Sequence, residues 1–331
     1  MELKEKWIKK GFVDEPIIDK ENLENAFLKL KKEKNAVLMA HFYQESNIQD
    51  IADFVGDSLA LAQFAAKTDA DIIMVAGVHF MGESAKILSP QKTVIVPDLN
   101  AGCSLADSCP PLEFKKFIDQ YPDHKVITYV NTSAEIKALS DMVVTSTNAK
   151  AIVDSFSPDE KLIFGPDKNL GNYINSITGR EMVLWDGACH VHEKFSLEKI
   201  LELKKENPDA EIIAHPECKK PLLMVADHVG STASLLKYTY TSDKKTFIVA
   251  TESGIIHQMK LKSPKKLFIP APPNDSTCAC NDCEFMRLNT MEKIYNALKH
   301  EWPSIEVPEE VRVQAVKPIE KMLKLSAQLG L

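Results

Sequence analysis

Short apolar runs rich in Val, Ile and Leu recur along the chain between segments with helical patterning. Runs of this length, bounded by polar segments, are typical of parallel strands that are buried on both faces. We therefore expect an α/β fold. Ten strands are predicted, within the segments AVLMAHFY, DIIMVAG, TVIVPD, KVITYVN, DMVVTST, KLIFGP, EMVLWDG, EIIAHPE, TFIVATE and KLFIPAPP.

The predicted strands form three groups, and the last strand of each group leads into a cysteine. Cys189 lies 86 residues after Cys103, and Cys283 lies 94 residues after Cys189. Each interval is close to the length of one small α/β unit, which indicates an internal repeat. We predict three similar three-layer, parallel-sheet domains at 1–112 (with an N-terminal helix), 113–194 and 195–290, followed by a helical segment at 291–331 that packs on the core.

Two flanking segments have helical patterning. Residues 20–34, KENLENAFLKLKKEK, read as an amphipathic helix with a basic end. Residues 307–328 read as a helix interrupted by Pro318, because proline removes a backbone donor and clashes with the preceding turn.

Polar, chemically capable residues follow the first strand of each group, and a hydroxyl-bearing segment follows further along. Ligands of open α/β sheets bind at the carboxyl ends of parallel strands, so these residues are candidates for a site. The strand-end residues are His41 and Tyr43, then Tyr129 and Asn131, then His215 and Glu217, and the hydroxyl groups are those of Ser58, Ser146, Ser231 and Thr232.

Composition narrows the classes of function. The net charge of -7 and pI near 5.8 argue against a general nucleic-acid surface, although a small anionic substrate remains open. The N-terminal segment has no apolar core of signal-peptide length, and stretches such as DIIMVAGVHFMG are too short to span a membrane. We expect a cytoplasmic protein without membrane or nucleic-acid partners.

Seven cysteines are too few for a disulfide scaffold in a chain of this length, so metal binding or catalysis is the favoured role of any clustered cysteines.

Three cysteines gather in the segment TCACNDCEFM, at Cys278, Cys280 and Cys283. A local zinc knuckle is not favoured, because only three thiols are present and no histidine lies within reach downstream. An iron-sulfur cluster fits better, since thiolates from separated segments can hold it and three suffice for a cubane with one open iron. Cys109 and Cys218 have no counterpart in the other groups and are predicted to be buried apolar residues.

A series of motifs between residues 36 and 290 resembles the quinolinate synthase family. They are AHFYQ, GDSLALAQ, AGVHFMGESAKIL, AGCSLADSC, YVNTSAEIKALSD, TSTNA, GPDKNLGNYI, WDGACHVHE, AHPEC, GSTAS, ATESGIIHQM and CACNDCEFM, in that order. A series of this length is far more specific than any single motif.

The resemblance implies three α/β domains in a pseudo-threefold arrangement around one [4Fe-4S] cluster per chain. By position, its ligands are Cys103, Cys189 and Cys283. Many members have proline after the third cysteine, where this chain has Glu284, and Cys278 and Cys280 are neighbouring competitors for the third position. The implied reaction is a condensation and dehydration of the transferase or lyase type in NAD biosynthesis. It joins iminoaspartate to dihydroxyacetone phosphate and yields quinolinate, phosphate and two waters.

The resemblance also suggests a partner. Iminoaspartate is a product of aspartate oxidation, so an aspartate-oxidising enzyme is the expected transient partner.

The same resemblance assigns roles to the strand-end residues. It implies that Glu217 and Tyr43 transfer protons and that His192 and His215 bind or polarise the substrate. His41 and Tyr129 are the other two acid/base candidates. Near neutrality, Glu217 would need a raised pKa and Tyr43 a lowered one to act as bases. Substrate binding is assigned to His41, Ser58, Tyr129, Asn131, Ser146, His215, Glu217, Ser231 and Thr232.

Each hydroxyl also has a structural explanation, because Ser and Thr commonly cap helices. Two other functions remain open from the residues alone. One is a metal-thiolate redox sensor that uses Cys278 and Cys280, and the other is a thiolate-ligated zinc hydrolase or deaminase.

Overall fold

The computed structural model describes residues 2–274 and 282–331, with side chains from residue 5 onward. It contains three separate four-stranded sheets whose paired strands are all parallel. The predicted α/β fold of three similar units is therefore confirmed. The first sheet comprises β1 (Ala36–His41), β2 (Phe54–Gly56), β3 (Ile72–Ala76) and β4 (Thr93–Ile95); the second β5 (Lys125–Tyr129), β6 (Met142–Val144), β7 (Leu162–Gly165) and β8 (Val183–Leu184); the third β9 (Glu211–Ala214), β10 (His228–Val229), β11 (Thr246–Ala250) and β12 (Leu267–Pro270).

The strand order is the same in every sheet. It reads β2-β1-β3-β4, β6-β5-β7-β8 and β10-β9-β11-β12. In each unit the order reverses between the first and third strands, and the crevice at that point is the usual ligand site of such sheets. We call the three units that carry these sheets unit 1, unit 2 and unit 3.

Helices cover the sheets of all three units. Unit 1 carries α1 (Glu2–Lys10), α2 (Leu23–Glu33), α3 (Ser46–Ile51), α4 (Ser58–Ala65), α5 (His79–Leu88) and α6 (Ser104–Asp107); unit 2 carries α7 (Pro111–Ile118), α8 (Ala134–Ala138), α9 (Ala149–Asp154), α10 (Lys168–Thr178) and α11 (His190–Glu193); unit 3 carries α12 (Leu197–Glu206), α13 (Lys220–Leu223), α14 (Thr232–Thr241) and α15 (Ile255–Lys262). After unit 3 come the 3₁₀ turn η1 (Met286–Leu288), α16 (Met291–His300) and α17 (Glu309–Gln328).

Two strands were absent from the sequence prediction. These are β2 and β10, of three and two residues, which lie at one edge of their sheets. The segments that contain them, DFVGD and DHVGS, carry too few consecutive apolar residues to produce a strand signal, so only pairing with the neighbouring strand defines them.

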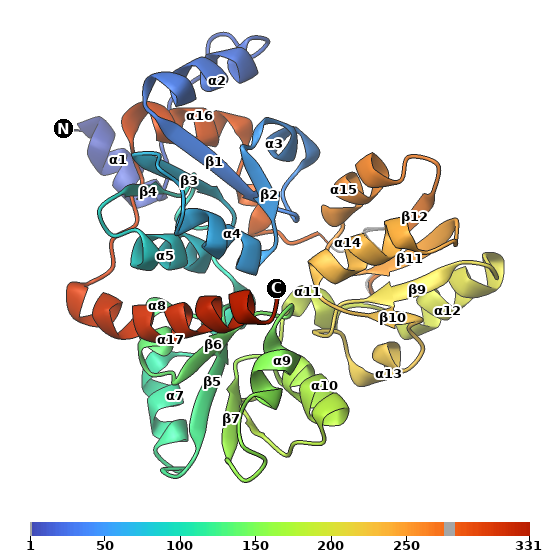
Figure 1. Ribbon diagram of the computed structural model, residues 1–331. Coiled ribbons are helices and arrows are strands. Elements are labelled where there is room, and N and C mark those ends of the chain that lie inside the picture. The colour runs from blue at the N-terminus through green and yellow to red at the C-terminus, as the bar shows by residue number, and fades with distance from the viewer. Residues whose placement is uncertain (1, 275–281) are drawn as a thin grey trace.

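The C-terminal helices return to the first two units (Figure 1). Helix α16 lies beside α2, where Ile294 and Leu298 share a buried cluster with Phe27. Helix α17 packs against α8 and β6 of unit 2 and against α5 of unit 1. The predicted interruption at Pro318 is wrong, because α17 runs continuously through this buried residue. The packing of α17 along both units outweighs the hydrogen bond that proline removes.

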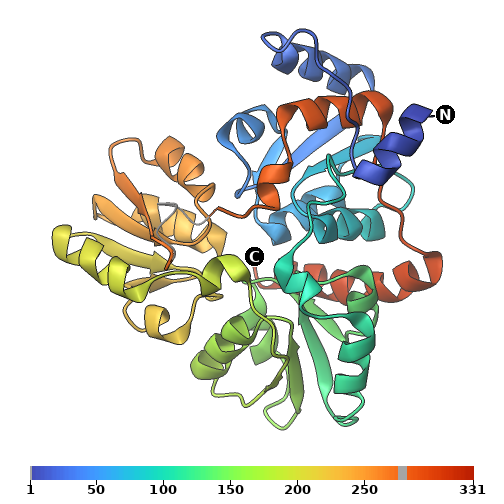
Figure 2. The ribbon, with the colours of Figure 1, turned by 180° about the vertical axis from the view of Figure 1, so that it is seen from behind.

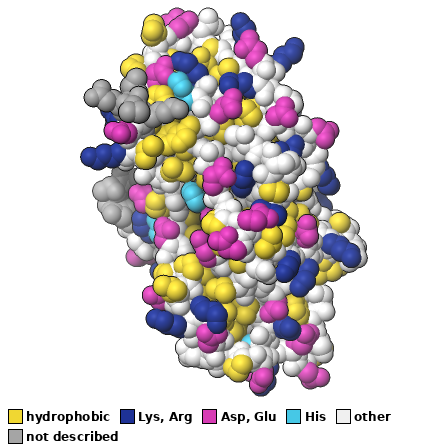
Figure 3. All heavy atoms as spheres, turned by 90° about the vertical axis from the view of Figure 1, so that its left-hand side faces the viewer, with side chains coloured by type: hydrophobic (Ala, Val, Ile, Leu, Met, Phe, Trp, Pro, Cys, Tyr) yellow, Lys and Arg dark blue, Asp and Glu magenta, His cyan; other side chains and the backbone are white. Residues whose placement is uncertain are grey.

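The three units surround a common centre when seen from the front and from behind (Figures 1 and 2). Acidic and basic side chains are interspersed over the face shown in Figure 3. Across residues 2–274 and 282–331, no helix combines the length and the apolar character needed for a bilayer crossing.

Candidate active site

The three units together line a cavity at their common centre. Each unit contributes residues from the carboxyl ends of its strands and from the turns that follow them. The residues of the sequence prediction that line the cavity are His41, Tyr43, Ser58, Cys103, Tyr129, Asn131, Ser146, Cys189, His192, His215, Glu217, Thr232 and Cys283.

Strand register explains why the hydroxyl segments meet the strand-end residues. His41 at the end of β1 pairs with Gly56 of β2, so the segment that starts α4 at Ser58 emerges next to it. In unit 2, Tyr129 pairs with Val144 of β6, and Ser146 follows two residues later. The same two-strand arrangement in unit 3 brings Thr232 to the cavity. The edge strands therefore determine where the hydroxyl groups lie.

Glu217 is the hub of a buried polar network. Its Oε1 accepts a hydrogen bond from the Tyr129 hydroxyl at 2.7 Å, and its Oε2 lies 2.9 Å from His192 Nδ1. His215 Nδ1 lies 3.7 Å from Oε1, and His215 Nε2 is 3.2 Å from the Ser146 hydroxyl. Unit 2 supplies Tyr129, Ser146 and His192, whereas unit 3 supplies His215 and Glu217, so the network exists only when these units pack together.

Tyr43 connects unit 1 to unit 3. Its hydroxyl lies 2.8 Å from the hydroxyls of both Thr232 and Thr251. Thr251 in turn lies 3.0 Å from His192 Nε2, the ring nitrogen opposite the one that faces Glu217. Each nitrogen of His192 thus has a defined polar neighbour, which fixes the orientation of the imidazole ring.

Burial dominates the ionisation of the site. It lowers the pKa of His41 and of His215 to about 3, so both rings are neutral near pH 7. For Glu217, burial raises the pKa, but the neighbouring His192 and the hydrogen bond from Tyr129 outweigh burial and lower the pKa to about 2. Burial and the Glu217 charge raise the pKa values of Tyr43 and Tyr129 well above 10. The condition stated for base catalysis, a raised pKa for Glu217 and a lowered one for Tyr43, is therefore not met.

Among the described residues, three buried side-chain atoms on the cavity wall have no hydrogen-bond partner: Asn131 Oδ1, Thr145 Oγ1 and His192 Nδ1. The last of these lies 2.9 Å from Glu217 Oε2. Buried polar atoms are nearly always satisfied, so Asn131 and Thr145 indicate that a polar ligand completes the site. The lining contains no Lys or Arg among the described residues, whereas Ser58 and Thr232 stand at the N-termini of α4 and α14. Helix N-termini stabilise anions through their free N–H groups.

The cysteines of the three units reach the same cavity. Cys103, Cys189 and Cys283 are all free thiols on its wall. Burial raises the pKa of Cys103 to about 12 and that of Cys283 to about 11, and it raises the pKa of Cys189 well above the ordinary value. A metal would displace these protons, because thiolates are the ligating form. Cys189, His192 and Glu217 also place one ligand atom each within 4.8 Å of one another, an arrangement that can hold a metal ion.

Comparison with known proteins identifies the family. The model of the quinolinate synthetase A protein family matches residues 25–324. The chain is 59% identical to the quinolinate synthase of Thermosynechococcus vestitus over 297 residues, which cover 90% of this chain and 93% of the relative. It is also 59% identical to the quinolinate synthases of Synechocystis sp. over 305 residues (92% and 96%) and of Chloroherpeton thalassium over 298 residues (90% and 92%).

The chain belongs to the quinolinate synthase A family. Membership in this enzyme family confirms the resemblance found in the sequence, and the functions of a redox sensor or a zinc hydrolase are not favoured.

Some residues singled out in the sequence of this family member lie away from the cavity. The hydroxyl of Ser231 accepts a hydrogen bond from Ser234 N and caps α14, which is the structural role open to it. Cys109 and Cys218 are buried, as predicted. Cys278 and Cys280 lie outside the described residues.

Sequence reasoning missed several polar residues of the site. Thr145, Thr251 and Glu252 line or support the cavity. Asp57 also escaped notice: it caps α4 through Ala60 N and accepts a 2.7 Å hydrogen bond from Thr147 of unit 2. Thr145, Thr251 and Glu252 all lie just beyond a strand, and this position is the signal that would have identified them.

Proposed function

We propose that this chain condenses iminoaspartate with dihydroxyacetone phosphate to form quinolinate, phosphate and two waters, with a [4Fe-4S] cluster bound by Cys103, Cys189 and Cys283. The observation that carries the proposal is the meeting of one cysteine from each unit in a cavity that also holds a network of acid/base groups. The family comparison supports it, since the relatives bear the name quinolinate synthase.

The donor set suits such a cluster. Three half-buried free thiols surround one cavity, and the rest of the wall offers hydroxyl and imidazole groups rather than a fourth thiol among the described residues. Three-thiolate ligation leaves one iron without a protein ligand, and that iron would act as a Lewis acid towards a substrate oxygen or nitrogen. The closeness of Cys189 to His192 and Glu217 supports a role for these acid/base groups next to that position.

Substrate binding uses dipoles rather than a basic cluster. The phosphate and carboxylate groups are anionic, and the N-termini of α4 and α14 lie at the cavity, where Ser58 and Thr232 line its wall. Asn131, whose side-chain oxygen lacks a partner, and the hydroxyl of Ser146 supply directed polar contacts. We assign these groups, together with neutral His41 and His215, to substrate binding.

The ionisation states divide the proton-transfer roles. Tyr43 and Tyr129 remain protonated near pH 7 and donate hydrogen bonds or protons to developing negative charge. The Glu217 carboxylate is ionised and lies 2.9 Å from His192 Nδ1, while His192 Nε2 lies 3.0 Å from the Thr251 hydroxyl. Glu217 therefore serves as an electrostatic anchor that orients the His192 ring in the cavity.

One experiment tests the proposal. The chain is purified without oxygen and supplied with iron and sulfide. Metal content, absorption and quinolinate formation from the two substrates are then measured. We expect a brown protein with about four irons per chain that forms quinolinate. A cluster without product would refute the substrate assignment, and a colourless chain that binds zinc instead would refute the cluster.

A further inference from the structure

The three units share a position whose side chain has no assigned role. Two residues beyond the third strand of each sheet stand Val78 after β3, Asp167 after β7 and Glu252 after β11. The carboxylates of units 2 and 3 are almost completely buried, with exposed fractions of 0% for Asp167 and 1% for Glu252. Removing a carboxylate from water costs free energy unless hydrogen-bond donors replace the water, so each of these two side chains requires such donors.

In unit 2 that set includes the backbone of a cysteine. Asp167 Oδ1 accepts a 2.7 Å hydrogen bond from Leu170 N and caps α10, while Oδ2 accepts a 3.3 Å hydrogen bond from Cys189 N. The turn before this cysteine lies tightly against the same strand end. A β-carbon on Gly187 would lie 2.5 Å from Pro166 O, so only glycine permits the approach.

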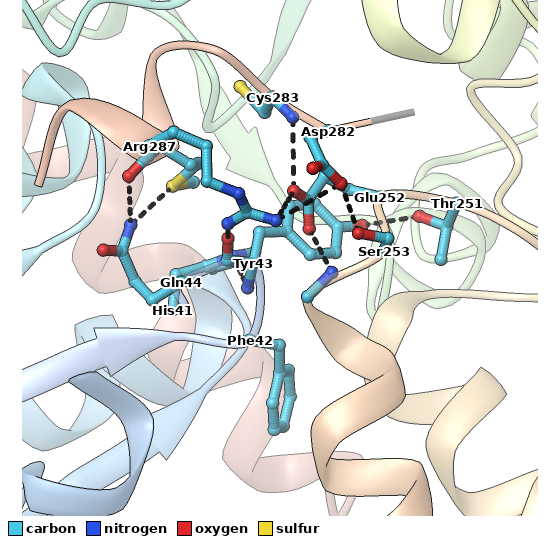
Figure 4. Close-up of polar contacts among 12 residues, drawn as sticks. His41, Phe42, Tyr43, Gln44, Thr251, Glu252, Ser253, Asp282, Cys283 and Arg287 are labelled. Carbon is cyan, nitrogen blue, oxygen red and sulfur yellow. Dashed lines mark hydrogen bonds and ion pairs between the residues drawn. The ribbon is translucent and has the colours of Figure 1, made fainter. Parts of the chain in front are cut away.

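Unit 3 repeats the arrangement with a longer side chain (Figure 4). Glu252 Oε2 accepts a 2.7 Å hydrogen bond from Gly254 N, and Oε1 accepts one of 3.2 Å from Cys283 N. Arg287 adds an ion pair of 2.8 Å to the same Oε1. Its other terminal nitrogen donates to Tyr43 O at 2.6 Å, and its own backbone N–H donates to Cys283 O at 3.2 Å.

These contacts matter because they satisfy the backbone N–H groups of the two cysteines. Neither Cys189 nor Cys283 lies within a strand or helix, so no ladder or helical hydrogen bond holds its N–H. In unit 1, where Val78 occupies the equivalent position, the segment before Cys103 is tied by the backbone instead, through a 2.7 Å hydrogen bond from His79 N to Ala101 O.

We propose that Asp167 and Glu252 are positioning residues that hold the metal-ligating Cys189 and Cys283, and that Arg287 orients Glu252 for this purpose. The proposal rests on the function proposed above, because it assumes that both thiols bind the cluster. Groups behind the ligands of a metal site fix ligand geometry and commonly decide how well the metal is retained. Here they act on the ligand backbone, which determines where each Cα–Cβ bond points.

The chemistry of the contacts suggests isosteric tests. Each carboxylate uses both of its oxygens to accept from N–H groups, whereas an amide of the same shape has only one acceptor oxygen. In Asp167→Asn or Glu252→Gln, one N–H must therefore face an NH₂ group. These variants keep the volume of the side chain and weaken the pair of hydrogen bonds that ties the cysteine N–H to Leu170 N in unit 2 or to Gly254 N in unit 3.

The measurement is the rate at which the anaerobically reconstituted holoenzyme releases iron to an excess of chelator, followed by loss of visible absorption. Loss of one buried hydrogen bond predicts release roughly five- to tenfold faster in Asp167→Asn and in Glu252→Gln. Since Arg287 acts through Glu252, Arg287→Gln should also accelerate release, and the double variant Glu252→Gln/Arg287→Gln should release iron little faster than Glu252→Gln alone.

Ser196→Ala is the matched control. Ser196 caps α12 through Lys199 N, as Asp167 caps α10, but its hydrogen bonds go to Lys199, Ile200 and Pro272 rather than to either cysteine. We expect this variant to unfold more easily and to release iron at the wild-type rate. Wild-type release rates in both Asp167→Asn and Glu252→Gln would overturn the positioning role and leave the proposed function standing. A wild-type chain that takes up no iron would overturn both. The two variants lie in different units, so one decides the question if the other fails to fold.

Discussion

His41 and His215 are buried histidines on the wall of one cavity, and their burial makes stability depend on pH. Both have a pKa lowered to about 3, against an ordinary value near 6.5, because the charged ring would lose its hydration. Between these values the unfolded chain binds a proton at each histidine and the folded chain does not. Stability is therefore present above pH 6.5 and is lost as pH falls towards 3.

The size of the effect follows from the two pKa values. At pH 5, each histidine lowers the free energy of unfolding by about 2 kcal/mol relative to pH 7, and the two together by about 4 kcal/mol. Glu83 acts with the opposite sign, because burial raises its pKa and its folded form then holds a proton where the unfolded form has lost it. The wild-type slope alone is therefore not diagnostic.

The comparison that isolates the histidines is a double variant, His41→Asn/His215→Asn, against the wild type. Urea denaturation of the cluster-free chain at pH 7 and pH 5 gives the free energy of unfolding in each case. We expect the double variant to lose about 4 kcal/mol less than the wild type between the two pH values. His79→Asn is the control, because His79 is partly exposed outside the central cavity. Equal losses for wild type and double variant would refute the argument that burial keeps these rings neutral.

Three further predictions concern activity. Cys103→Ala or Cys189→Ala should abolish cluster binding and quinolinate formation while circular dichroism shows an intact fold, and full activity in either would exclude that cysteine as a ligand. Glu217→Gln should lower kcat by roughly 10²- to 10⁴-fold, because the His192 ring loses its carboxylate partner; a kcat within twofold of wild type would contradict its role as anchor. Asn131→Ala should raise the KM for one of the anionic substrates by about tenfold, as expected for a lost hydrogen bond to a charged group, and unchanged KM values for both would remove Asn131 from the binding site.

The sequence alone determined the class of fold and most of the residues that face the cavity. Continuous apolar runs such as DIIMVAG are a local signal of buried parallel strands, and chain direction puts the residues that follow them at one edge of a sheet. For this reason the local pattern is enough to identify His41, Tyr129 and Glu217 as candidates. The internal repeat is also visible in the sequence, because a cysteine follows the last strand of each group at similar intervals.

Other parts of the fold depended on partners distant in sequence. The edge strands β2 and β10 are defined by pairing with β1 and β9, and α17 passes through Pro318 because units 1 and 2 pack along it. Local propensity contains neither kind of information.

Only the tertiary structure decided how the site works. Tyr129 reaches Glu217 across 88 residues of sequence, and Tyr43 reaches Thr251 across 208. The ionisation of these groups follows from burial and from those partners, which is why Glu217 has a lowered pKa and Tyr43 a raised one. A residue's type and its place at a strand end are local properties, whereas its neighbours and its exposure to water arise only when the three units pack around their common cavity.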